Sequence, residues 1–153
     1  MGDARAVYNY LSNDLRYEPQ EVLVLLLLDA KQRLIRRINI AKGTLTRLIT
    51  HPRDIFREAI RHNAACFVIA HNHPSGDPSP SKADKELTRS IKDAADIIGI
   101  RIADHVVIGT PAPDRLPYFS FVENGLLERK KKNDEKDGTK EQKPEQQQEQ
   151  QPS

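Results

Sequence analysis

The sequence is poor in cysteine, which limits the ways in which it can be cross-linked or bind metal. Cys66 is the only cysteine among 153 residues, so an internal disulfide and every zinc site built on paired cysteines are excluded. A nucleoside deaminase site, which combines H-x-E with P-C-x-x-C, is excluded for the same reason. The apolar neighbours in AACFVIA predict a buried, unreactive thiol. Any zinc held by this chain must therefore rest on histidine and carboxylate side chains.

The sequence also lacks a surplus of one charge and has few aromatic residues. Its 24 Lys and Arg nearly balance 22 Asp and Glu, aromatic residues make up 5%, and tryptophan is absent. Proteins that bind nucleic acid generally present a basic patch or aromatic platforms on which bases stack. The composition therefore gives little support to nucleic acid as a partner.

No segment stays hydrophobic for long enough to cross a membrane. The longest strongly apolar run, Val22 to Leu28, is far shorter than the roughly 20 residues of a membrane-spanning helix. The opening MGDARAVYNYLSNDL has no signal-peptide pattern. We therefore predict a cytoplasmic protein with no membrane partner.

Hydrophobic side chains are missing from the end of the chain. Residues 129–153 are rich in Lys, Glu, Gln and Pro and contain no aliphatic or aromatic residue. Such a segment has nothing to bury against the entropy of ordering its backbone, so we predict a disordered polar tail. The remaining chain divides into an N-terminal helix within residues 1–17 and a single domain over 18–128.

Hydrophobic periodicity predicts alternating helices and strands in this body. Apolar residues at helical spacing indicate helices over residues 4–15, 52–62 and 81–98. Apolar or alternating runs indicate strands over 21–29, 33–41, 64–70, 106–108 and 118–122. This order predicts a single α/β domain in which helices flank a mixed sheet.

One short stretch carries chemically informative spacing. His71 and His73 are two residues apart at the end of a predicted strand, so their imidazoles leave the same face. Ser81 and Asp84 are three residues apart at a predicted helix start and share a face as well. If the Pro-rich loop between them folds the helix start over the strand end, two imidazoles and one carboxylate converge.

Each half of this pattern also has a simpler interpretation. Ser81-x-x-Asp84 is a passable capping box, and a histidine at a strand end is often only hydrogen-bonded or solvated. Taken together, the two halves favour a metal site, in which Asp84 can serve as a ligand and as the helix-start anion. Two histidines and a carboxylate suit zinc, and three protein ligands leave a fourth position for water, as in catalytic sites.

The string HNHPSGDPSPSKAD resembles the JAMM motif, H-x-H followed by seven residues and S-x-x-D, of the JAB/MPN metalloprotease superfamily. The runs LLLLDAKQRLI, KGTLT, HPRDIFREAI, ADHVVIG and YFSFVENGLL are similar in order and spacing to the RadC-like branch. The resemblance covers about Glu18 to Leu127. It implies a JAB/MPN-type mixed β-sheet flanked by helices, a cytidine-deaminase-like sandwich, over residues 18–128.

The resemblance also implies roles for individual residues. His71, His73 and Asp84 correspond to the ligands of one zinc ion per chain, and Ser81 to a serine that steadies the tetrahedral intermediate. The superfamily uses a glutamate near an early strand as general base. Glu21 is the best match and Glu18 the alternative.

The activity implied is zinc-dependent hydrolysis of a peptide or isopeptide bond in a peptide or protein substrate. A DNA-repair or nucleic-acid accessory role, attached to the RadC name, is the alternative. A third interpretation is a protein-binding module with a silent site, which retention of the four motif residues disfavours. The substrate and the oligomeric state are left open.

Several other polar residues have both a structural and a functional interpretation. Structural or solvated roles are favoured for His51, His62, Asp104 and His105, although either of the last two can supply a hydrogen bond to a ligand imidazole. The Gly43-Thr44 pair is consistent with a simple turn or with the lining of a substrate groove.

Overall fold

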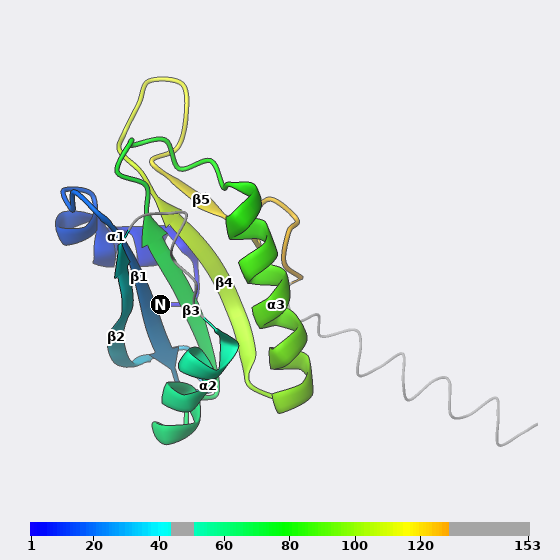
Figure 1. Cartoon of the computed structure of the whole chain (residues 1–153). Helices are drawn as coiled ribbons and strands as arrows, with labels where there is room; N and C mark the ends of the chain where they lie inside the picture. Colours follow the sequence, from blue (N-terminus) through cyan, green and yellow to red (C-terminus); the bar gives the residue numbers. More distant parts are fainter. Residues whose placement is uncertain (44–50, 129–153) are drawn as a thin grey trace, which may run out of the picture.

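The computed structural model describes residues 1–43 and 51–128. They form a five-stranded sheet with the strand order β2-β1-β3-β4-β5 (Figure 1). β3 (Cys66–Asn72) and β4 (Arg101–Ile108) run parallel, whereas all other neighbouring strands are antiparallel. The expected single α/β domain with a mixed sheet is therefore confirmed.

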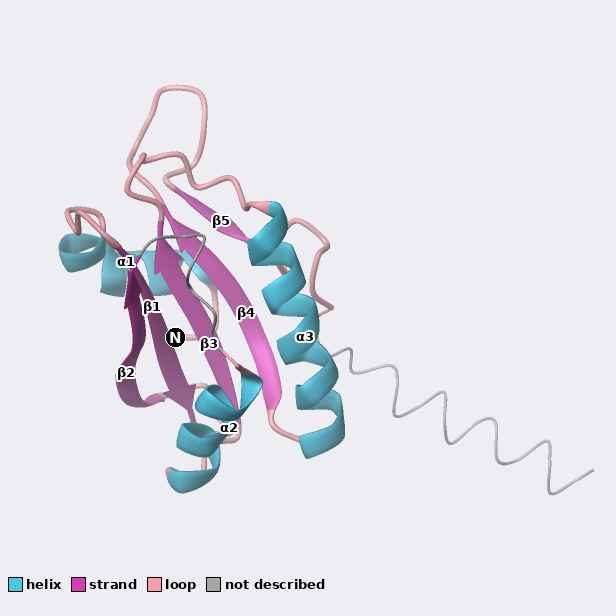
Figure 2. Ribbon diagram, in the orientation of Figure 1, coloured by secondary structure: helices cyan, strands magenta, loops and turns pink. Residues whose placement is uncertain are grey.

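The central strand β1 (Glu21–Leu28) is buried along its whole length because both faces of the sheet are covered (Figure 2). Its even-numbered residues pack into a core with α1 (Ala4–Leu15), and its odd-numbered leucines pack into a second core with α2 (Pro52–Arg61) and α3 (Lys82–Ile98). Alternate side chains of a strand point to opposite faces. This explains why EVLVLLLL reads as one continuous apolar run rather than as an alternating one.

The helix ends follow local sequence signals. Pro52 opens α2 after the N-cap His51, whose Nδ1 accepts a hydrogen bond from the Arg53 N–H at 3.1 Å. Ser81 and Asp84 form a capping box at the start of α3, and Gly99 ends it in the left-handed conformation with φ of 85°. The predicted starts and ends of these helices agree with the structure to within a residue.

Four strands differ by two residues or more from the bounds predicted. β2 (Leu34–Gly43) ends two residues later than the predicted 33–41. β3 begins two residues late and extends through Asn72, so it contains His71. β4 begins at Arg101, well before the predicted 106–108. β5 (Tyr118–Ser120) ends two residues early, because the Val122 N–H donates to the side chain of Asp104 at 3.0 Å instead of continuing the ladder.

Residues 129–153, predicted as a tail, lie outside the described residues, and so does Thr44. Among the described helices, none combines the length and hydrophobicity needed to span a bilayer.

The two-core architecture predicts where truncation is costly. Leu25 is fully buried on the α2/α3 side of the sheet, whereas Ile97 is 87% exposed on α3. Leu25→Ala should lower the free energy of unfolding by about 2–5 kcal/mol through lost burial and a residual cavity. Ile97→Ala should change it by less than about 0.5 kcal/mol. Urea denaturation of both variants measures the difference, and equal losses would contradict the assignment of the core.

Candidate metal centre

β3 delivers two imidazoles to the edge of the site. His71 is the next-to-last residue of β3, held between Leu23 of β1 and Val107 of β4. His73 follows the strand, and its N–H donates to the carbonyl of Ile108 at 3.0 Å, which continues the parallel ladder. Because they are two residues apart on extended backbone, both rings leave the same face, as the spacing predicted.

Asn72, which lies between these histidines, ties the end of β3 to the start of β1. Its buried side-chain Oδ1 accepts from the Val22 N–H at 2.7 Å, and its Nδ2 donates to the Gln20 carbonyl at 3.0 Å. These two bonds hold the backbone on either side of Glu21. A side chain therefore substitutes for the strand ladder at the point where β1 begins, and it fixes Glu21 beside His71.

The first turn of α3 contributes the remaining carboxylate. Asp84 Oδ2 accepts from the Ser81 N–H at 2.9 Å, and the Asp84 N–H donates to Ser81 Oγ at 3.0 Å. The same carboxylate lies over the histidines, with Oδ1 3.2 Å from His71 Nε2 and Oδ2 3.1 Å from His73 Nε2. The capping box and the contacts with both imidazoles therefore coexist in one side chain.

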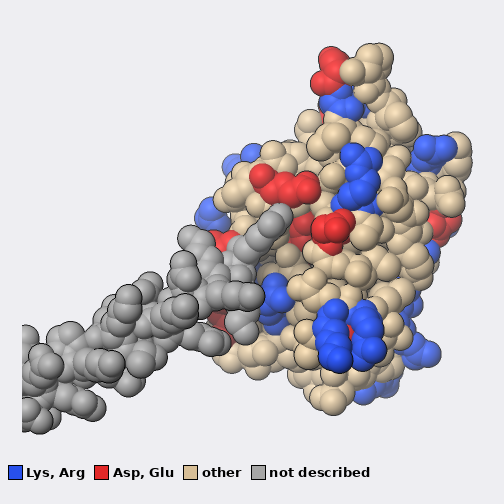
Figure 3. Space-filling view, turned by 180° about the vertical axis from the view of Figure 1, so that it is seen from behind, with Lys and Arg blue, Asp and Glu red and all other residues tan. Residues whose placement is uncertain are grey.

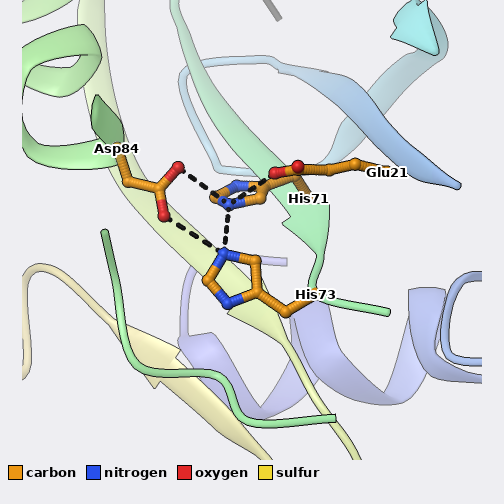
Figure 4. A group of neighbouring side chains, drawn as sticks. All are labelled: Glu21, His71, His73 and Asp84. Atoms are coloured by element: carbon orange, nitrogen blue, oxygen red, sulfur yellow. Dashed lines mark hydrogen bonds and ion pairs between the residues drawn. The ribbon is translucent and has the colours of Figure 1, made fainter. Parts of the chain in front are cut away.

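Four side chains from three separate elements converge at this point: Glu21, His71, His73 and Asp84 (Figure 4). Each offers one ligand atom, and these atoms lie within 4.8 Å of one another. His71 Nε2 lies 3.2 Å from His73 Nε2 and 3.3 Å from Glu21 Oε1. Such a group can hold a metal ion.

The distances between donor atoms suit a small tetrahedral ion. With zinc–ligand bonds of about 2.0–2.1 Å, neighbouring ligand atoms lie about 3.3 Å apart. The separations among His71 Nε2, His73 Nε2 and the Asp84 oxygens are 3.1–3.2 Å. In addition, Glu21 Oε2 is buried with no hydrogen-bond partner among the described residues. The donor set and this unpaired oxygen both fit a site completed by a cation and its water.

Burial and mutual contact shift the ionisation of the group. Burial raises the pKa of Glu21 to about 7, with the Asp84 carboxylate acting in the same direction and His73 against it. Burial also disfavours the charged form of Asp84, but its contacts with the His71 and His73 rings and the hydrogen bond from the Ser81 N–H outweigh it and hold the pKa of Asp84 far below its ordinary value. A buried anion therefore faces the imidazoles, which favours a cation.

The pKa values of the two imidazoles shift in opposite directions. Complete burial lowers the pKa of His71 despite its contacts with Asp84. Burial acts on His73 in the same direction, but hydrogen bonds with Asp84 and with the Asp77 carbonyl outweigh it and raise its pKa. Because a carbonyl only accepts, His73 Nδ1 must donate to the Asp77 oxygen 2.8 Å away. His73 Nε2 is thus the atom left to take a proton or a metal ion.

The other residues considered from the sequence are placed as follows. Ser81 Oγ caps α3 next to Asp84, and its own proton remains free to donate to a ligand. Glu18 lies outside the centre, where it pairs with Lys42 at 3.2 Å. Gly43 ends β2 (Leu34–Gly43) opposite Glu21 in the strand register. His62 is the partly buried C-cap residue of α2, and it lies 3.7 Å from Glu58 of that helix.

The structure also shows, for His105, the contact that the sequence analysis gave as the less favoured interpretation. His105 is completely buried, and its Nε2 lies 2.8 Å from Nδ1 of His71, on the side away from the centre. Asp104 instead accepts hydrogen bonds from the Val122 N–H and Ser120 Oγ, which stabilise the turn after β5. The structural role favoured for Asp104 thus agrees with its contacts, whereas His105 contacts a candidate ligand.

Comparison with known proteins gives a consistent family match. The sequence profile of the RadC-like JAB domain matches residues 1–126. The chain is 45% identical to a UPF0758 protein of Trichlorobacter lovleyi over 121 residues, which cover 79% of this chain and 50% of that protein. It is 44% identical to a UPF0758 protein of Pelobacter propionicus over 123 residues, which cover 80% and 52%. The chain thus spans about half the length of the curated relatives it matches.

The centre predicts a specific metal stoichiometry. Purified protein should contain about one zinc ion per chain by elemental analysis, and Asp84→Ala should lose it. Asp84→Asn should lose it too while keeping an oxygen to accept from the Ser81 N–H, which separates metal binding from capping. Asp96→Ala, which removes an exposed carboxylate of the same helix, should retain the ion. Wild-type protein without zinc after exposure to it would contradict the assignment.

Zinc binding should also depend on pH. The raised pKa of His73 means that protons compete with zinc for Nε2. The apparent zinc affinity should therefore rise with pH up to the pKa of His73 and level off above it. Below that pKa the expected slope is about tenfold per pH unit for one displaced proton. Competition titrations with a chelator of known affinity measure this slope. An affinity that does not change with pH would contradict it.

Proposed function

The chain belongs to the family of RadC-like JAB domains, and from the arrangement of its buried centre we propose that it is a zinc-dependent metallopeptidase. Its substrate would be a peptide or isopeptide bond in a peptide or protein. The observation that chiefly supports this function is that Glu21 lies beside His71, His73 and Asp84 and has a buried carboxylate oxygen with no hydrogen-bond partner among residues 1–43 and 51–128.

His71, His73 and Asp84 would hold the ion, with Glu21 next to it. Bound zinc supplies an acidified water and a positive charge that polarises the scissile carbonyl. His71 and Asp84 are almost completely buried, and the capping box and the sheet hold them in place. These ligands need little rearrangement to bind the ion, so their geometry would be set by the fold.

Glu21 would act as the general base. The attacking water gives a proton to the Glu21 carboxylate, and the protonated carboxyl then passes it to the leaving amine. A group works best in both directions when its pKa is close to the working pH. Burial, which raises the pKa of Glu21 to about 7, places it in that range. Glu18 would have no part in the reaction, because it pairs with Lys42 away from the centre.

Ser81 would stabilise the oxygen that gains charge as the amide carbon becomes tetrahedral. Its Oγ accepts from the Asp84 N–H, so that hydrogen bond does not use the hydroxyl proton, which can donate to the oxyanion. The N-terminus of α3 adds a favourable partial positive charge at the same place. This arrangement suits acyl transfer, in which an oxyanion forms, and amide hydrolysis in particular, since the leaving amine needs a proton.

A role as a nucleic-acid accessory module has less support. Binding to the phosphate backbone requires clustered Lys and Arg. On the face shown in Figure 3, Lys and Arg are interspersed with Asp and Glu over the described surface. The buried centre presents imidazole and carboxylate groups, which bind a cation rather than a phosphate. We therefore favour hydrolysis as the function.

The proposed general base can be tested with a matched pair of glutamates. Glu21→Gln should lower the rate of peptide cleavage by about 100-fold or more while zinc content stays the same, because it removes proton transfer but not a ligand. Glu18→Gln should leave the rate unchanged. A library of peptide and isopeptide-linked substrates, digested by zinc-loaded protein and read by mass spectrometry, provides the assay. Absence of cleavage by the wild type, or equal rates in Glu21→Gln, would contradict the proposal.

A further inference from the structure

A hydrogen-bonded chain of buried side chains leads from the back of the centre to the first turn of α3. His105 Nε2 lies 2.8 Å from His71 Nδ1, and His105 Nδ1 lies 2.5 Å from Thr88 Oγ1. Thr88 Oγ1 in turn donates to the carbonyl of Asp84 at 2.9 Å. This series of hydrogen bonds therefore connects two of the candidate ligands, His71 and Asp84, through groups that do not face the ion.

The direction of each hydrogen bond follows from counting protons. The Thr88 hydroxyl has a single proton, and the Asp84 carbonyl, which can only accept, takes it. Thr88 Oγ1 must then accept from His105, so the proton of the His105 ring lies on Nδ1. A neutral imidazole with its proton on Nδ1 offers a lone pair on Nε2. His105 Nε2 is thus an acceptor, and His71 Nδ1 must donate to it.

The same arrangement of protons is reached by starting from His71, at the other end of this series of hydrogen bonds. His71 Nε2 points at His73, Glu21 and Asp84, so it is the atom available to a metal ion. It can bind only as an unprotonated nitrogen, which places the proton of His71 on Nδ1. Proton counting from Thr88 and the requirement for a free Nε2 therefore agree on one arrangement.

The position of His105 is fixed by packing as well as by hydrogen bonds. Its ring stacks on Phe121 with centroids 4.5 Å apart and planes 11° apart, and it has no exposed surface. Without water, every ring N–H has to find its partner inside the protein. A β-bulge in β4, where Phe67 pairs with Ile102 but Val68 pairs with Asp104, turns His105 onto the face of His71.

We propose that Thr88 and His105 are positioning residues that hold His71 in the tautomer with its proton on Nδ1, which presents Nε2 to the metal ion. This inference rests on the metal-dependent function proposed above, because the tautomer matters only if Nε2 binds an ion. Neither residue touches the ion or the substrate. Their effect is to prepare the ligand before the ion arrives, which strengthens zinc binding.

Nuclear magnetic resonance tests the tautomers directly. Two-bond proton–nitrogen correlation spectra of ¹⁵N-labelled protein report which ring nitrogen carries the proton. Both His71 and His105 should show the Nδ1–H tautomer in zinc-free protein, and His71 should keep it when zinc is added. A proton on Nε2 of His105 in the wild type would overturn the proposal.

Two substitutions of Thr88 separate its hydrogen bonds from its shape. Thr88→Val keeps the volume but removes the hydroxyl, and it should weaken zinc binding by about 10- to 100-fold, as loss of partners behind a ligand commonly does. It should also give a mixture of His105 tautomers. Thr88→Ser restores the hydroxyl and should bring the affinity back to within about threefold of the wild type. Equal zinc affinities of Thr88→Val and Thr88→Ser would overturn the proposal.

These results can be told apart from failure of the metallopeptidase function. Zinc binding without peptide cleavage would contradict hydrolysis but leave the effect of Thr88 on affinity intact. If the wild type bound no zinc, the function would fail, whereas the tautomers of the zinc-free protein would still support or overturn the hydrogen-bonded chain. Thermal unfolding of each zinc-free variant verifies that it is folded before its affinity is compared.

Discussion

The buried carboxylate of Asp84 is the interaction on which the arrangement of this site depends. Burying an ionised group is costly unless hydrogen bonds and opposite charge compensate it. Here the compensation comes from the Ser81 N–H, the start of α3 and two imidazoles from the end of β3. Because these partners come from two parts of the fold, the start of α3 and the end of β3, the carboxylate sets the position of the helix relative to the sheet. A cation bound at this point would be coordinated by the imidazole nitrogens and carboxylate oxygens that face one another.

Much of the candidate site was predictable because its spacing follows local rules. His71 and His73 share a face through the two-residue repeat of extended chain, and Asp84 occupies the position that a capping box demands. Glu21 lies fifty residues from His71 and was selected only through the family resemblance. The contact depends on the Asn72 side chain, whose hydrogen bonds to the backbone on either side of Glu21 could not be read from the sequence.

The sequence left open which of Asp104 and His105 contacts a ligand imidazole, because the backbone of β4 leaves its regular repeat just before them. The bulge in β4 adds a residue between Ile102 and Asp104, so that Ile102 and His105 face the same side although they are three residues apart. A strict two-residue repeat from Ile102 puts Asp104 on that side instead. The early end of β5 has a related cause, since the Asp104 side chain replaces a strand partner for the Val122 N–H. The overall α/β order was predictable because periodicity over long segments is insensitive to one extra residue.

We propose that this fold, which contains a single buried cysteine, builds a zinc centre from two histidines and an aspartate, with Glu21 beside the ion rather than bound to it. A crystal structure of the zinc-loaded protein, with anomalous scattering recorded at the zinc edge, tests this most directly. One strong anomalous peak should lie within bonding distance of Nε2 of His71, Nε2 of His73 and the Asp84 carboxylate, with Glu21 contacting a bound water. A peak elsewhere, or one bonded directly to Glu21 in place of a histidine, would contradict it.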